Sequence, residues 1–183
     1  MVFSFDRVMM ICLAMIVSIA GFQDLRFQRI PNLITYPTIV AALIFHFLIN
    51  GFSGLLFSVG GLSVGLGIGI VPYIMGGVGA GDAKLIGAIG ASVGAKGVII
   101  VVLFSALAGG VYIIVLAFTR WGYVTGVIGG VARSLWILAT RGLLLSFFDA
   151  EQYDKPKLYY GVPIALGTFA YVITHFLEAA PLW

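Results

Sequence analysis

Charged side chains are scarce in this chain of 183 residues: Asp, Glu, Lys and Arg make up 9% of it, whereas hydrophobic residues make up 61%. A typical soluble domain carries about 25% charged residues. The mean hydropathy of +1.13 also lies far outside the soluble range. The composition excludes an ordinary soluble domain. It predicts an all-α polytopic membrane protein that is embedded in the lipid bilayer.

Cysteine and histidine are also nearly absent. The single cysteine, Cys12, lies inside an apolar run, which excludes a disulfide framework and a paired-cysteine zinc site. The two histidines, His46 and His175, each stand alone in an apolar stretch and are expected to form hydrogen bonds there. The sequence thus predicts no metal and no cofactor, and it gives no indication of a nucleic-acid partner.

The apolar runs predict a single domain, 1–183, that crosses the membrane as helices. A hydrocarbon core of about 30 Å needs about 20 helical residues. The six predicted transmembrane helices are 7–23, 33–49, 54–75, 83–95, 97–118 and 161–177. The fourth is short for a crossing and could instead be a re-entrant half-helix. The distribution of basic residues decides between these two topologies.

If the short helix crosses, two of the 10 basic residues, Arg7 and Lys96, lie on one side of the membrane. The other side then holds the remaining eight, which are Arg26, Arg29, Lys84, Arg120, Arg133, Arg141, Lys155 and Lys157. Without that crossing the split is four to six. Because cytoplasmic loops are enriched in Lys and Arg, the sequence favours six crossings, with both termini outside and loops 24–32, 76–84 and 119–160 in the cytoplasm. The last loop, between helices 5 and 6, is predicted to hold an amphipathic segment on the cytoplasmic leaflet.

Two acidic residues fall on that cytoplasmic side. Asp24 follows the first predicted helix and Asp82 opens the fourth. Two carboxyls that share a proton titrate as a pair, so one can activate a water while the other protonates a departing amine. Taken singly, Asp24 could be an interfacial charge beside Arg26 and Arg29. Asp82 could cap its helix or pair with Lys84. Their shared side of the membrane favours a catalytic pair.

Glycines have two predicted roles. Gly79 and Gly81 precede the second carboxylate, where they allow unusual backbone conformations and the close approach of a substrate strand. A second set recurs at four-residue spacing, which lets membrane helices pack closely. This set is Gly61, Gly65 and Gly69, then Gly90 and Gly94, and then Gly126 and Gly130.

Three segments resemble motifs of the type IV prepilin peptidases. Gly79-Ala80-Gly81-Asp82 is similar to the GxGD motif of intramembrane aspartyl proteases. Asp24, followed after five residues by Ile30-Pro31-Asn32, is similar to the segment that holds the family's first aspartate. Tyr160-Gly161-Val162-Pro163 resembles its aromatic-Gly-x-Pro segment. The resemblance implies that Asp24 and Asp82 are the catalytic pair, that no metal is required, and that the enzyme removes prepilin leader peptides at the cytoplasmic membrane face.

One departure from the larger prepilin peptidases narrows the expectation. Those enzymes carry paired CxxC motifs and also methylate the new pilin N-terminus, whereas this chain has only Cys12. We therefore expect no N-methyltransferase activity. The size resembles the short peptidases of tight-adherence (Flp) pilus systems, which implies Flp-like prepilins as partners and the bacterial inner membrane as the location. The oligomeric state stays open.

Residues around the two aspartates have expected supporting roles. Pro31 is expected to fix the start of the second helix. Asn32 either orients a carboxyl or satisfies backbone groups, and Lys84 either pairs with Asp82 or binds substrate carboxylates. Two other functions stay open: a small ion- or proton-coupled transporter, and a non-catalytic component of a pilus or secretion assembly.

Overall fold

The computed structural model describes residues 2–27, 29–75, 78–119 and 160–178, together with the single residues 132 and 136. In this part of the chain there are four long helices and no strand. They are α1 (Val2–Phe27), α2 (Asn32–Ile74), α3 (Ala80–Thr119) and α6 (Gly161–Glu178). Helices α1, α2 and α3 are long and apolar enough to cross a membrane, and α6 is a shorter apolar helix. Over these residues, the prediction of a helical membrane protein is confirmed.

The prediction of six separate helices is not confirmed. The expected helices 33–49 and 54–75 form the single element α2, and the expected 83–95 and 97–118 form the single element α3. The physical reason is that the helical backbone resumes after a single glycine, so no loop separates the two halves of either element. The predicted amphipathic segment in loop 119–160 lies almost entirely outside the described residues.

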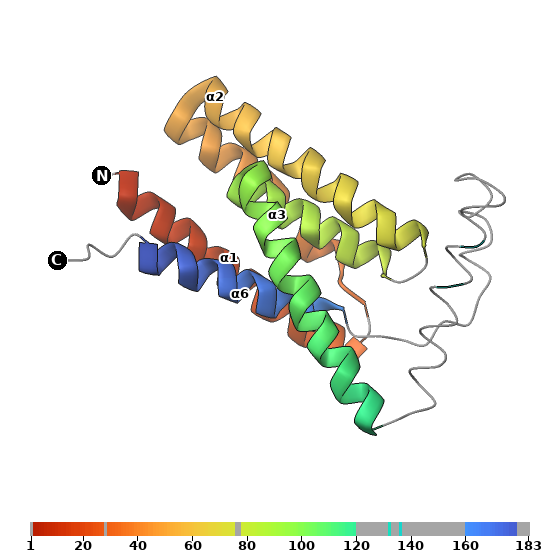
Figure 1. Cartoon of the computed structure of the whole chain (residues 1–183). Helices are drawn as coiled ribbons and strands as arrows, with labels where there is room; N and C mark the ends of the chain where they lie inside the picture. The colour runs from red at the N-terminus through yellow and green to blue at the C-terminus, as the bar shows by residue number, and fades with distance from the viewer. Residues whose placement is uncertain are drawn as a thin grey trace.

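Both long helices bend sharply at that glycine. A straight helix of 43 residues, the length of α2, would measure about 65 Å, more than twice the bilayer core. The backbone leaves the helical conformation at Gly51 (φ 60°, ψ −142°) and, in α3, at Gly94 (φ 75°, ψ 177°). Such positive φ values favour glycine. Figure 1 shows that the first arm of α2 (32–50) and its second arm (52–74) run back alongside each other, while the second arm of α3 (95–119) leaves the first arm (80–93) at a steep angle.

The second arm of α2 packs closely against the first arm of α3. A Cβ atom on Gly65 would lie 2.6 Å from the carbonyl oxygen of Ile86, so any side chain there would collide with backbone. Equivalent close contacts repeat along the two arms, with Gly61 against Gly90 and Gly69 against Ala83. The predicted packing role is therefore confirmed for Gly61, Gly65, Gly69 and Gly90. Gly94 forms the bend of α3, and Gly126 and Gly130 lie outside the described residues.

The bend in α3 is capped by two side chains of α2. Carbonyl groups just before a helix break lack their usual partner four residues further on. The Ser58 hydroxyl donates to the Ala91 carbonyl oxygen at 2.7 Å, and Nε2 of His46 donates to the Ser92 carbonyl oxygen at 3.0 Å. The prediction that His46 forms a hydrogen bond is confirmed. His175 differs, because its buried Nδ1 has no hydrogen-bond partner among the described residues.

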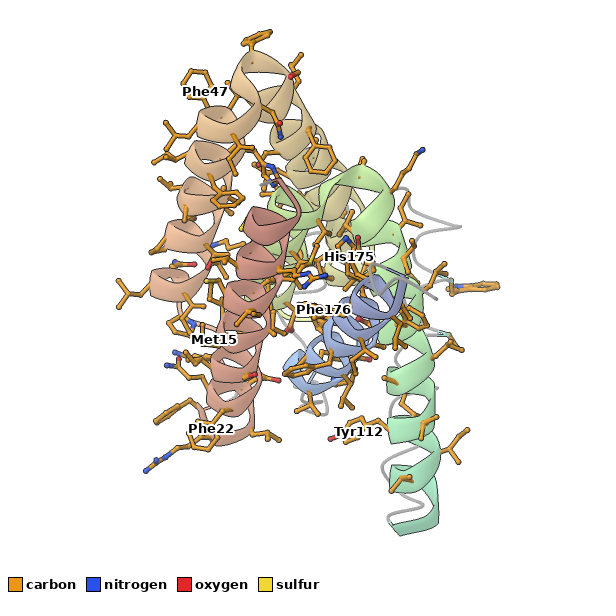
Figure 2. All side chains as sticks on the ribbon, turned by 90° about the vertical axis from the view of Figure 1, so that its left-hand side faces the viewer. Met15, Phe22, Phe47, Tyr112, His175 and Phe176 are labelled. Atoms are coloured by element: carbon orange, nitrogen blue, oxygen red, sulfur yellow. The ribbon has the colours of Figure 1, made fainter. Side chains whose placement is uncertain are left out.

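Helix α1 turns one face to the bundle and the other outward. Its buried apolar residues recur at helical spacing and are Met10, Leu13, Val17 and Ala20. On the opposite face Met15 and Phe22 are 55% and 61% exposed, and Figure 2 shows both projecting away from the other helices. Asp24 continues the buried stripe, since α1 runs on to Phe27 instead of ending at residue 23 as predicted. The helix itself therefore turns this carboxylate inward.

Candidate active site

Asp24 lies where the end of α1 meets the beginning of α6. Its side chain is only 5% exposed. Its Oδ2 atom accepts a hydrogen bond of 2.8 Å from the backbone N–H of Gly161, the first residue of α6. The N-terminal end of a helix carries a partial positive charge, so it favours a carboxylate. A simple interfacial charge beside Arg26 and Arg29 does not describe this buried position.

Asp82 lies in the first turn of α3 and is 6% exposed. Its Oδ2 atom accepts a hydrogen bond of 3.0 Å from the N–H of Gly79, the residue just before the helix. In a capping box, a side chain in the first turn accepts a hydrogen bond from the N–H of the residue before the helix in the same way. The interpretation of Asp82 as a helix cap is therefore correct for its Oδ2 atom. The other oxygen, Oδ1, is buried and has no hydrogen-bond partner among the described residues. Capping does not explain a buried, unpaired carboxyl oxygen.

The two carboxyls lie close enough to interact electrostatically. Asp24 reaches the site from α1 and Asp82 from α3, and each is held by the backbone N–H of a glycine. Buried apolar residues of α3, Leu85 and Ile89, follow Asp82 at helical spacing and hold its helix against the bundle. Two acidic groups in one apolar setting give a candidate acid–base pair.

Comparison with known proteins gives one match. The sequence matches the type IV leader peptidase family over residues 10–114, which include both Asp24 and Asp82. The chain belongs to the type IV leader peptidase family. Comparisons with curated proteins and with solved structures give no match. Family membership assigns an aspartic-type peptidase activity toward leader peptides and, with the long apolar helices, a multi-pass inner-membrane location.

Two glycines shape the entry to α3 in this leader peptidase. A Cβ atom on Gly79 would lie 3.1 Å from Oδ2 of Asp82, and one on Gly81 would lie 3.0 Å from Cβ of Ile30. Gly79 therefore allows its N–H to reach the carboxylate. Gly81 allows the start of α3 to pack against the connection between α1 and α2.

Pro31, Asn32 and Lys84 lie beside the pair and contact other groups. Pro31 is the residue before the first turn of α2, with φ −70°, so its predicted place at the start of that helix is confirmed. Nζ of Lys84 donates to Oδ1 of Asn32 at 2.9 Å and lies 5.3 Å from the ring centroid of Tyr36. Asn32 thus accepts a hydrogen bond from the ammonium group of Lys84. These contacts join the beginnings of α2 and α3.

Tyr160 and Gly161 were not among the predicted site residues, and they lie outside the family match. The signal that could have identified them was the aromatic-Gly-x-Pro segment. The carbonyl of Tyr160 accepts the first hydrogen bond of α6, from the N–H of Ile164 at 3.2 Å. Burial first, and then the charge of Asp82 and the neighbouring Tyr112, raise the pKa of Tyr160 above its ordinary value. Figure 2 shows Tyr112 projecting from α3.

The site combines acidic side chains with backbone N–H donors. Among the described residues, no group of three or more His, Cys, Asp or Glu side chains is placed to hold a metal ion. The arrangement that the structure offers consists of two interacting carboxyls, two glycine N–H donors and a half-buried phenol.

Proposed function

We propose that this leader peptidase is an aspartyl endopeptidase that uses Asp24 and Asp82 to remove the leader from type IVb (Flp-like) prepilins at the cytoplasmic membrane face. The observation that carries the proposal is geometric: two buried carboxyls from distant segments of the chain each accept a hydrogen bond from a glycine N–H, and they lie near enough for the charge of Asp24 to act on Asp82. Two such groups cannot readily ionise together, so one proton is shared between them.

The proposed reaction uses the two carboxyls in different roles. The ionised carboxyl takes a proton from a water molecule as the water oxygen attacks the scissile carbonyl carbon, which gives a tetrahedral intermediate. The protonated carboxyl donates a hydrogen bond to the former carbonyl oxygen of this intermediate. It then transfers its proton to the nitrogen of the departing amine as the peptide C–N bond breaks. The buried Oδ1 of Asp82, which has no partner among the described residues, supports this use of the pair.

We further propose six crossings, with the active site on the cytoplasmic side and both termini outside. The bends at Gly51 and Gly94 support this topology, because they divide α2 and α3 into arms that each reverse or change direction. The distribution of basic residues also supports a cytoplasmic active site. Arg29 lies in the connection before α2, and Lys84 lies in the first turns of α3, and cytoplasmic segments are enriched in Lys and Arg. In Figure 1, α1 begins and α6 ends at the same end of the bundle.

We propose that the enzyme acts without N-methyltransferase activity, since the sequence has one cysteine and thus no paired CxxC motif. Mass spectrometry of the processed pilin tests this point. The expected product has the mass of the cleaved pilin with an unmodified N-terminus. An added methyl group in a strain that holds no other prepilin peptidase would contradict it.

Co-expression with a candidate Flp-like prepilin tests the peptidase. The wild-type chain is expected to shorten the prepilin, and Asp24→Asn or Asp82→Asn is expected to reduce the rate by about 1,000-fold or more. Asp154→Asn, in the hydrophilic stretch 149–157, is the matched control and is expected to cleave normally. Persistent cleavage with either Asp24→Asn or Asp82→Asn would refute the pair. Ion flux into liposomes that requires Asp82, without pilin cleavage, would instead support a transporter.

A further inference from the structure

We propose that α6 supplies a positioning residue, Gly161, whose backbone N–H fixes the carboxyl of Asp24 in its catalytic orientation. The inference rests on the proposed function, because it concerns how one member of the catalytic pair is held. It adds a third segment of the chain to a site otherwise built from the end of α1 and the beginning of α3.

The hydrogen bond between Gly161 and Asp24 connects residues that are 137 positions apart, over 2.8 Å and in a buried setting. Gly161 is the first residue of α6. The first N–H groups of a helix have no partner within the helix, so the Asp24 carboxylate satisfies a donor that would otherwise be buried and unpaired. A charge-assisted hydrogen bond of this kind is stronger than one between neutral groups.

The contact requires glycine at position 161. A Cβ atom there would lie 2.8 Å from Cβ of Asp24 and 2.9 Å from its Oδ2 atom. Real Cβ atoms do not approach other atoms so closely, so a larger residue would move either α6 or the carboxyl. Asp24 lies on the buried face of α1, so the backbone of this helix is held by packing. The carboxyl can turn about its side-chain bonds more easily than α1 or α6 can move.

The surrounding helix contacts hold the beginning of α6 in place. A Cβ atom on Gly21 of α1 would lie 3.3 Å from Cβ of Ala165, and Gly167 lies directly against Ser105 of α3. Pro163, in the first turn of α6, occupies a position where its missing N–H costs nothing. Figure 1 shows α6 between α1 and the second arm of α3. The N–H of Gly161 therefore points at Asp24 from a helix that packs closely against α1 and α3.

This geometry assigns different roles to the two oxygens of Asp24. The hydrogen bond from Gly161 occupies Oδ2 and fixes the side-chain rotation, which leaves Oδ1 to accept the proton of the water. In Asp82, likewise, the N–H of Gly79 occupies Oδ2, and Oδ1 has no hydrogen-bond partner among the described residues. Loss of the Gly161 contact would leave the substrate bound but the carboxyl misplaced.

The first test compares Gly161→Ala with Gly110→Ala, a matched control because a Cβ atom on Gly110 would meet nothing within 4 Å. Gly161→Ala is expected to lower kcat for prepilin cleavage by about 100-fold, since a misplacement near 1 Å can cost that much, with KM within about threefold of wild type. Gly110→Ala is expected to match wild type in both. An unchanged kcat in Gly161→Ala would overturn the proposal, and so would a rise in KM alone.

A second measurement remains informative if Gly161→Ala does not fold, because it leaves Gly161 in place. Amide hydrogen exchange of Gly161 is compared between the wild-type chain and Asp24→Ala. Because α6 offers this N–H no helical partner, its exchange is expected to be at least about tenfold faster once the acceptor is removed. Equal exchange rates would overturn the proposal. Absence of cleavage by the wild-type chain would instead refute the proposed function, and the exchange result does not depend on cleavage.

Discussion

The backbone N–H of Gly79 lies 3.0 Å from Oδ2 of Asp82, only three residues away, whereas the equivalent bond from Gly161 to Asp24 spans 137 residues. Each carboxylate therefore accepts a hydrogen bond from a backbone N–H at the beginning of a helix. Asp82 does so within its own segment, and Asp24 does so across the bundle. The local contact depends on a short glycine-containing turn. The distant contact depends on how α6 packs against α1, so the two halves of the site are sensitive to different substitutions.

Gly79→Ala tests the local contact. The added Cβ atom would lie 3.1 Å from Oδ2 of Asp82, so the carboxyl has to shift by a few tenths of an ångström or more. We expect kcat for prepilin cleavage to fall by about 10- to 100-fold, while the helix remains folded because Gly79 precedes it. Gly67→Ala is the control, since a Cβ atom on Gly67 meets nothing within 4 Å. Equal cleavage by both variants would contradict the role of Gly79.

The packing of α2 on α3 predicts opposite effects for two glycines of the same arm. Alanine is favoured over glycine in a helix by about 1 kcal/mol, so Gly60→Ala, which meets nothing within 4 Å, is expected to be neutral or stabilising. Gly65→Ala places a Cβ atom 2.6 Å from the Ile86 carbonyl oxygen, and we expect a net loss of about 2 kcal/mol or more. Thermal unfolding in detergent measures both variants. A stabilised Gly65→Ala would show that the helices can separate at little cost.

Much of this fold could be predicted from the sequence because it follows from local patterns. The apolar runs gave the helical segments, and the predicted breaks near residues 50–53 and 96 lie beside the bends at Gly51 and Gly94. The break itself appeared as a bend within a continuous helix, because one glycine with positive φ can redirect the chain without a loop. Hydropathy cannot separate these two outcomes.

The contacts of the site were harder to predict. The GxGD segment and the predicted side of the membrane indicated Asp24 and Asp82 as a candidate pair, but the partner of each carboxylate depends on tertiary packing. Gly161 could not be connected with Asp24 from spacing alone, since their contact requires α6 to lie against α1. For Lys84 the sequence suggested pairing with Asp82 or binding of substrate carboxylates, but it did not indicate the hydrogen bond to Asn32, which arises because the beginning of α2 packs beside the beginning of α3.

A double-mutant cycle tests the contact between Lys84 and Asn32. The hydrogen bond of 2.9 Å joins α2 to α3, but Asn32 is exposed, so water weakens the contribution of this contact to stability. We expect Lys84→Met and Asn32→Leu to show a coupling free energy of about 0.5–1 kcal/mol. Lys96→Met, which changes the other lysine of α3, is expected to show no coupling with Asn32→Leu. Additive effects of Lys84→Met and Asn32→Leu would mean that the contact does not stabilise the fold.

The raised pKa of Tyr160 predicts that the folded chain loses stability at alkaline pH. Burial, the charge of Asp82 and the neighbouring Tyr112 raise the pKa of Tyr160 above its ordinary value of 10.0, so the folded chain keeps the phenol proton to higher pH than the unfolded chain does. The stability gained in this way is complete below about pH 10 and decreases as the pH rises through the folded pKa. We therefore expect the free energy of unfolding to fall more steeply above about pH 10 in the wild type than in Tyr160→Phe. Tyr36→Phe, at the 52% exposed Tyr36, is the control and should keep the wild-type slope. Parallel pH curves for wild type and Tyr160→Phe would show that the phenol of Tyr160 is not in the environment described.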